Sequence, residues 1–217
     1  LQDLRLARNR IRQLPTAPTA WAVLSNLELA DNALAELPTA WFVRSSSGSR
    51  SRSPLPLMSL QLQKNKLRAL PDELFTELPL LMSLDVSQNE LRRLPDTLGR
   101  AQQLENLYAG ANQLEELPAS LCALTRLVAL DVSRNRLRAL PPLSADHGLR
   151  TLYASYNPLA APPPVLPRRL RELHLAGCAL AAPLPPYGLR KPEIVLLHMN
   201  ALTAVDVPAL LADTSRL

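Results

Sequence analysis

The segment Leu127–Pro141, LVALDVSRNRLRALP, carries the pattern that decides the fold. Apolar residues stand at its first, fourth, sixth, eleventh and fourteenth places, and Asn135 stands at the ninth. The alternation of apolar and polar residues in Leu130-Asp131-Val132 is typical of a short, half-buried strand. A single copy of such a unit cannot bury its apolar face alone, so several copies must stack to form a core.

The same pattern recurs along the whole chain. Successive ninth places are separated by 23, 33, 24, 23, 23, 22, 21 and 22 residues. The residues at these places are Asn9, Asn32, Asn65, Asn89, Asn112, Asn135, Asn157, Cys178 and Asn200. An asparagine amide both donates and accepts, so we expect it to satisfy backbone groups on neighbouring coils. Cys178 is a weak donor and predicts a looser junction at that coil.

These repeats resemble the leucine-rich repeat signature, whose period is about 20–29 residues. The stretch LPDTLGRAQQLENLYAGANQLEELP, residues 94–118, resembles in particular the intracellular 23-residue type LxxLxLxxNxLxxLPxxLxxL. That type occurs in Ras-pathway scaffolds, in Scribble- and Erbin-like polarity proteins, in leucine-rich repeat phosphatases with a pleckstrin-homology domain and in fungal adenylyl cyclases. The resemblance covers nearly the whole chain and implies the fold rather than a particular member.

The predicted fold is therefore an α/β solenoid, a right-handed leucine-rich repeat horseshoe. It has a parallel concave sheet of about nine strands and short helical, 3-10 or extended convex segments. Residues 1–217 should form one domain of about nine repeats. Because the chain begins inside a repeat without a polar cap, we expect a fragment of a longer protein. The proline-rich convex segments after residue 142 should lack regular helix. Trp21 and Trp41 are expected to fill the outer layer of the core.

One insertion interrupts the repeats. The long spacing after Asn32 places extra residues in 43–56, a segment rich in Ser, Arg and Pro that predicts disorder. Ser53 precedes Pro54 and follows Arg50 and Arg52, which makes it a candidate phosphorylation site. The alternative is a surface insertion without a regulatory role.

The outward places of the repeat predict a partner-binding face. The third, fifth, seventh and eighth places should point away from the core, and the seventh holds mostly Ala, Ser and Gly. Three of the four tyrosines and two of the three histidines fall on this face in its C-terminal half. Aromatic residues and Met are enriched at protein interfaces. The predicted partner-binding residues are Tyr108, Asp131, Arg134, Tyr153, Tyr156, His174, His198 and Met199. Cross-strand packing alone is the competing explanation.

No nucleotide-binding loop, zinc spacing or nucleophile motif occurs in the sequence, so we predict no enzyme activity for this segment, no cofactor and no metal. His174 and His198 could approach each other near Glu172, but no fixed ligand set is evident. The net charge of +5 raises nucleic-acid binding as a minor alternative to solvated rim charge. No apolar run is long enough for a membrane span. Cys122 and Cys178 lie far apart and indicate reduced thiols in the cytoplasm.

The resemblance implies two functional classes. The first is a monomeric signalling scaffold that binds a protein partner, such as a small GTPase or a phosphatase subunit. The second is the targeting module of a larger phosphatase, kinase or cyclase whose catalytic domain lies outside this segment.

Overall fold

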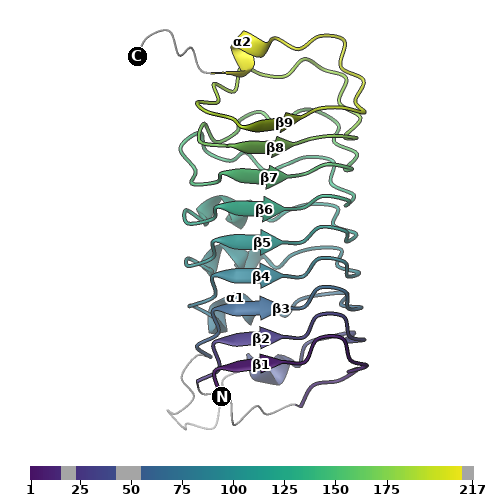
Figure 1. Cartoon of the computed structure of the whole chain (residues 1–217), viewed down its shortest axis with the longest axis vertical. Helices are drawn as coiled ribbons and strands as arrows, with labels where there is room; N and C mark the ends of the chain where they lie inside the picture. The colour runs from purple at the N-terminus through teal and green to yellow at the C-terminus, as the bar shows by residue number, and fades with distance from the viewer. Residues whose placement is uncertain (16–22, 43–54, 212–217) are drawn as a thin grey trace.

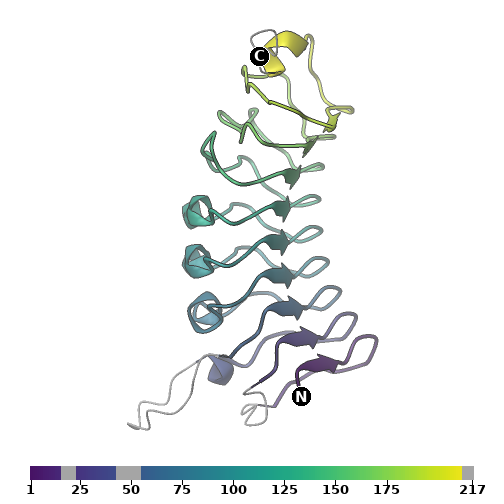
Figure 2. The ribbon, with the colours of Figure 1, turned by 60° about the vertical axis from the view of Figure 1, so that its left-hand side comes forward.

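The computed structural model describes residues 1–15, 23–42 and 55–211. Within these residues the chain forms coils that stack one above another in chain order (Figures 1 and 2). Each coil contributes one three-residue strand to a single parallel sheet. The strands are β1 (Asp3–Arg5), β2 (Asn26–Glu28), β3 (Ser59–Gln61), β4 (Ser83–Asp85), β5 (Asn106–Tyr108), β6 (Ala129–Asp131), β7 (Thr151–Tyr153), β8 (Glu172–His174) and β9 (Ile194–Leu196). The predicted repeat solenoid and its sheet of about nine strands are confirmed.

The register of the sheet follows the repeat. The third, fourth and fifth places of each coil pair with the same places of the next, as in Leu107 with Leu130 and Tyr108 with Asp131. The fourth place points into the core, where Leu130 is buried beneath the strand. The third and fifth places line the outer surface of the sheet, which we call the sheet face. A side chain on this face is therefore placed by its position in the repeat.

Leucine fills the interior because every coil buries the same places. Leu84, Leu107 and Leu130 at the fourth place are almost fully inaccessible to solvent. Burying one leucine side chain stabilises the fold by about 1.5–3 kcal/mol. The column of buried leucines is continuous from coil to coil, so each coil shields the apolar side chains of its neighbour from solvent.

The side opposite the sheet carries short helical segments in the regular coils. These are η1 (Thr39–Trp41), α1 (Leu74–Glu77), η2 (Asp96–Arg100) and η3 (Ala119–Ala123), with α2 (Val207–Leu210) near the end of the described chain. No helix forms in residues 142–206, as predicted from their prolines. Tyr187 instead joins two of these loops, because its buried hydroxyl donates to the carbonyl of Pro163 over 2.8 Å.

Two further predictions concern the outer layer. Trp41 is buried as expected, and its Nε1 donates to the Pro15 carbonyl, whereas Trp21 lies outside the described residues. Most of the predicted insertion 43–56, including Ser53, also lies outside them. At its C-terminal end, however, Leu55 is described and belongs to the buried core.

The ninth-place asparagines join each coil to the preceding one. The Asn112 Nδ2 donates to the carbonyls of Ala109 in its own coil and Val86 in the preceding coil. Its Oδ1 accepts from the backbone N–H of Leu91 at 3.0 Å. Asn65, Asn89, Asn135 and Asn157 repeat this arrangement and are buried. The predicted role of the asparagine is confirmed.

Cys178 interrupts this ladder. Its Sγ lies 3.3 Å from the Ala154 carbonyl. The thiol sulfur is only a weak acceptor, however, and does not replace an asparagine Oδ1, which would accept a hydrogen bond from a backbone N–H of the preceding coil. The Leu159 N–H, which stands at the place that bonds to an asparagine elsewhere, bonds instead to the carbonyl of Asn157 within its own coil. The side-chain link between these two coils is weaker, as the sequence predicted.

Replacing Asn112 with alanine should therefore lower the free energy of unfolding by about 1–3 kcal/mol per buried group left unsatisfied. Urea denaturation followed by circular dichroism measures the change. The matched control is Asn9→Ala, because Asn9 is exposed and its side-chain amide bonds only to the carbonyls of Leu6 and Ala7 in its own coil. Equal losses for the two variants would contradict a role in joining coils.

Candidate functional site

The sheet face brings several of the predicted residues into one column. Strand register places the fifth-place residues Tyr108, Asp131, Tyr153 and His174 side by side on β5 to β8. Neighbouring strands of a sheet lie about 4.8 Å apart. Each of these four side chains is partly exposed. The sequence predicted this column because the alternation of a strand leaves no other face for the fifth place.

Tyr153, Glu172 and His174 form a compact cluster at the C-terminal end of this column. The Tyr153 hydroxyl donates to Glu172 Oε2 over 2.7 Å. The rings of Tyr153 and His174 meet edge to face, with centroids 4.5 Å apart. His174 Nε2 lies 3.8 Å from the same Glu172 oxygen. Glu172, which the sequence analysis had placed only near the histidines, therefore holds the Tyr153 hydroxyl and lies close to the His174 imidazole.

The hydrogen bond to Glu172 is the main reason why the pKa of Tyr153 is raised to about 12. Deprotonating the phenol would place a second negative charge beside the carboxylate and remove the donated proton. Partial burial adds to the shift.

Replacing Glu172 with glutamine should lower the Tyr153 pKa from about 12 towards 10, because the neighbouring negative charge disappears. The tyrosinate absorbance during an alkaline titration measures this, and the Tyr153→Phe protein identifies the contribution of that phenol. Glu28→Gln, on the distant strand β2, is the control. An unchanged titration in Glu172→Gln would contradict the assigned cause.

Asp131 is held in a defined orientation between the two tyrosines of the column. Its Oδ1 accepts from the backbone N–H of Ser133 at 2.8 Å and from the Ser133 hydroxyl at 2.7 Å. A Cβ atom added to Gly110 on the neighbouring coil would lie only 2.9 Å from Asp131 Oδ2. Glycine at that seventh place therefore leaves the space that the carboxylate occupies.

The eighth-place residues lie in the turn that follows each strand. In all nine described coils this residue adopts a left-handed backbone, from Arg8 at φ 57° to Met199 at φ 56°. The Arg134 guanidinium carbon lies 4.9 Å from the centre of the Tyr156 ring. The same ring covers Gly177, whose missing Cβ would otherwise collide with it. Arg134 and Tyr156 thus form a second group beside the sheet face.

The remaining predicted residues lie further along the molecule. Met199 is 69% exposed in the turn after β9, and His198 beside it is also exposed. Leu196 rather than His198 pairs with His174 in the register. The structure therefore brings the predicted residues into two contacting pairs, Tyr153 with His174 and Arg134 with Tyr156, whereas His198 and Met199 extend the face towards β9. Their role in binding a partner stays a prediction.

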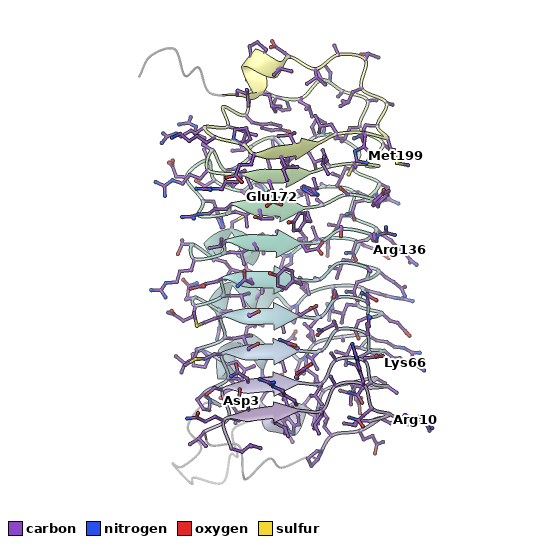
Figure 3. The ribbon with its side chains drawn as sticks, viewed as in Figure 1. Asp3, Arg10, Lys66, Arg136, Glu172 and Met199 are labelled. Carbon is purple, nitrogen blue, oxygen red and sulfur yellow. The ribbon has the colours of Figure 1, made fainter. Side chains whose placement is uncertain are left out.

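Charge is divided between the sheet and its rim. Strands β2 to β9 carry the carboxylates of Glu28, Asp85, Asp131 and Glu172 but no Lys or Arg. Exposed basic residues gather instead in the turns of the first, third and sixth coils. They are Arg8, Arg10, Lys64, Lys66, Arg134 and Arg136, and Figure 3 shows Arg10, Lys66 and Arg136 along one edge of the sheet. Among the described residues, Arg5 on β1 is the only Lys or Arg on the sheet face, so most of the positive charge lies outside this face.

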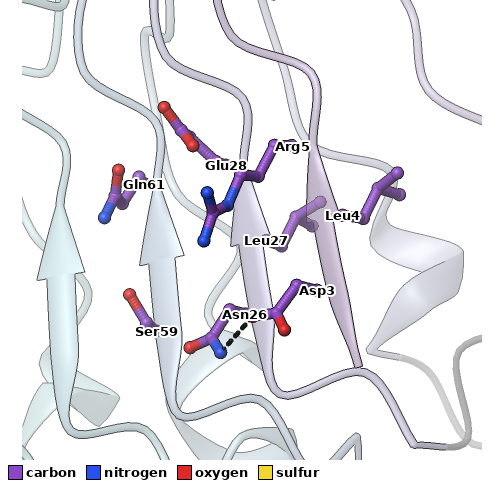
Figure 4. A pocket seen from close by; sticks show the side chains of 8 residues that line it. All are labelled: Asp3, Leu4, Arg5, Asn26, Leu27, Glu28, Ser59 and Gln61. Carbon is purple, nitrogen blue, oxygen red and sulfur yellow. Dashed lines mark hydrogen bonds between the residues drawn. The ribbon is translucent and has the colours of Figure 1, made fainter. Parts of the chain in front are cut away.

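A polar hollow occupies the opposite end of the sheet face. It encloses about 300 Å³ over β1, β2 and β3 (Figure 4). Asn26 Nδ2 donates to Asp3 Oδ1 across its floor over 2.6 Å. The hollow contains Arg5 and Glu28 but no aromatic residue, so its chemistry differs from that of the tyrosine column.

His147 is a buried titratable residue that sequence reasoning did not single out. It lies in the loop before β7, where its Nδ1 accepts from the backbone N–H of Leu149 at 3.2 Å. Burial lowers the pKa of its imidazole below the usual 6.5. No repeat place marks this residue, because the loop departs from the regular pattern.

The folded protein should lose stability as the pH falls below about 6.5, where the unfolded chain begins to protonate His147 and the folded chain does not. His147→Asn should reduce this loss, because an asparagine oxygen can accept from an N–H two residues later without titrating. Urea midpoints at pH 7 and pH 5 measure the effect. His198→Asn, at an exposed histidine, should show the same difference in urea midpoint between pH 7 and pH 5 as the wild type. An equal effect of both variants would refute the role of His147 in this pH dependence.

Within the described residues, no group of three or more His, Cys, Asp or Glu side chains is arranged to hold a metal ion. The thiols of Cys122 and Cys178 are free, and burial raises the pKa of the latter. Among the described helices, none has the length and apolar character that a membrane crossing requires.

The family model described as leucine rich repeat matches residues 56–114, from the third coil into the fifth. No curated protein matches the chain. Among solved structures, the effector YopM of Yersinia pestis is 28% identical with a TM-score of 0.64, over 96% of this chain and 55% of that one. A leucine-rich repeat protein of Leptospira interrogans is 25% identical, with a TM-score of 0.59, over 95% of this chain and 62% of that one.

A plant membrane receptor kinase ectodomain from Arabidopsis thaliana, GASSHO1/SCHENGEN3, is also similar. It is 25% identical with a TM-score of 0.73, and the match covers 95% of this chain and 25% of the ectodomain. The chain spans less than two thirds of the length of each of these three structures. Leucine-rich repeat folds generally act as protein–protein interaction modules and are typically non-catalytic. The repeat, the sheet and the comparisons together show that the chain has a leucine-rich repeat fold.

Proposed function

We propose that the sheet face over β5 to β8 binds a protein partner. The observation that carries this proposal is the gathering of aromatic rings there, with Tyr108, Tyr153 and His174 in one column and Tyr156 in the adjoining turn. Tyrosine presents a large apolar ring with a polar end and few rotatable bonds, which suits it to protein interfaces. Tyr156 is 42% exposed, so its ring offers area that a partner could bury.

The seventh place supports the approach of a partner. In the coils of β4 to β8 it holds Ser87, Gly110, Ser133, Ser155 and Ala176. Ser87 and Ser133 are partly exposed, whereas Gly110, Ser155 and Ala176 are buried. No bulky side chain at this place would therefore block a partner that approaches the rings. The plant receptor ectodomain, whose structure was solved in complex with CASPARIAN STRIP INTEGRITY FACTOR 2, presents the same kind of fold to its partner.

The resemblance to intracellular leucine-rich repeats supports a signalling scaffold in the cytoplasm, with a small GTPase or a phosphatase subunit as the partner and the chain as a monomer. The two free cysteines agree with a reducing compartment. The second candidate, implied by the same resemblance, is a targeting module of a larger phosphatase, kinase or cyclase.

Truncating Tyr153 and Tyr156 to alanine should abolish capture of the partner, because both rings leave the face together. Pull-downs from a cell lysate, with mass spectrometry of the bound proteins, measure the change. Circular dichroism and a urea midpoint establish whether the variant is folded, since Tyr153 also bonds to Glu172.

The matched control truncates Met58 and Met82, two exposed large side chains at the second place of neighbouring coils, outside the sheet face. This double variant should retain the partner. A photo-cross-linking residue at position 156 should capture the same protein, whereas one at Val165, in the loop before β8, should not. Undiminished capture by the double tyrosine variant would refute the proposal.

A further inference from the structure

The column on the sheet face alternates carboxylates with aromatic rings. Register places Asp85, Tyr108, Asp131 and Tyr153 on successive strands β4 to β7. Asp131 therefore has a tyrosine on each side, at the strand spacing of about 4.8 Å. An ordered carboxylate with an aromatic residue on each neighbouring strand is an arrangement that can attract a cation through both charge and ring quadrupole.

The Asp131 carboxylate is oriented through one of its oxygens, and the other oxygen accepts no hydrogen bond from the described residues. Both hydrogen bonds from Ser133 go to Oδ1, and no described residue donates to Oδ2. The carboxylate packs against Gly110, where a Cβ atom would collide with it, and Asp131 is partly exposed to solvent. The protein thus fixes the carboxylate through one oxygen and leaves the other for a donor from outside.

The two neighbouring tyrosines leave room above Asp131. Their strands are two intervals apart, or about 9.6 Å. The Tyr153 ring is held towards β8 by Glu172 and His174, which places it on the far side from Asp131. A guanidinium or ammonium group bound to Asp131 would lie beside Tyr108 on the neighbouring strand, and a cation within about 6 Å of an aromatic ring is attracted to it.

No basic group of the chain occupies this position. Strands β2 to β9 contain no Lys or Arg, and within the described residues Asp131 forms no ion pair. Arg134, three residues later, lies over the Tyr156 ring instead. The described chain therefore leaves this carboxylate available to a cation from another molecule.

A second carboxylate defines how far apart the basic side chains of the partner should be. Asp85 lies on the other side of Tyr108, two strands from Asp131, and its Oδ1 accepts from the Ser87 N–H in the same way. The two carboxylates are separated by about 9.6 Å. A polyproline II segment rises about 3.1 Å per residue with three residues per turn, so side chains three apart point the same way about 9.3 Å apart.

We propose that Asp131 and Asp85, with Tyr108 between them and Tyr153 beyond, bind arginine or lysine side chains placed three residues apart on an extended partner segment. Arginine fits best, because its planar group can stack on a ring while donating to a carboxylate. This inference rests on the proposed function, since it names what the sheet face recognises in its partner.

The test uses a fluorescent peptide with arginine at every third position in a proline and alanine background. Its binding is measured by fluorescence anisotropy at low and at physiological salt. The same peptide with citrulline in place of arginine keeps the shape without the charge and should bind far more weakly. A peptide with glutamate at those positions should not bind.

Asp131→Asn should weaken the binding of the arginine peptide roughly tenfold. The asparagine oxygen can keep the contacts with Ser133, but the negative charge is lost. The control is Asp146→Asn, which removes one exposed carboxylate from the loop before β7. Tyr108→Phe should keep binding and Tyr108→Leu should weaken it, since only the former retains the π-face.

Equal weakening by Asp131→Asn and Asp146→Asn would show general electrostatic attraction and overturn the inference. Equal binding of the citrulline peptide, or no binding of the arginine peptide to the wild type, would also overturn it. The photo-cross-link at position 156 reports on the proposed function separately. A captured partner without arginine-peptide binding leaves that function standing while the inference fails.

Discussion

The asparagine at the ninth place is the constraint on which the solenoid depends. Each strand is only three residues long, so each coil must turn out of the sheet at once and leave backbone groups without sheet partners. Asn112 and its equivalents bond to carbonyls on two coils and accept an amide from the preceding one. Since leaving a buried backbone group unpaired costs about 1–3 kcal/mol, this side chain stabilises both the turn and the junction between coils.

That constraint separates the residues that build the fold from those available for recognition. Leucine at the buried places and asparagine at the ninth are used by the stack itself. The third and fifth places carry no such duty, and on β4 to β7 the fifth place holds an alternation of carboxylates and tyrosines. The basic residues lie in the turns. A chain of net positive charge thereby presents a sheet face without Lys or Arg after β1.

Residues that follow the repeat could be placed from the sequence, and those that depart from it could not. Tyr108, Asp131, Tyr153 and His174 lie where the alternation of a strand places them. The left-handed turn at the eighth place was not foreseen, because Arg, Lys, Gln, Ala, Tyr and Met are found there where Gly or Asn would signal it. His147 gave no signal because burial of a loop residue depends on how neighbouring coils cover it. Leu55 joined the core although its neighbours in sequence suggested a loop.

By itself, the sequence determined the solenoid, the number of coils and the columns to which each outward residue belongs, because a repeat of buried leucines admits one register of stacking. Only the tertiary structure decided which neighbours in a column touch. The bond from Tyr153 to Glu172, the seat of Asp131 over Gly110 and the stacking of Arg134 on Tyr156 join residues of different coils or turns. They depend on side-chain directions and separations of a few ångströms, which a linear pattern does not encode.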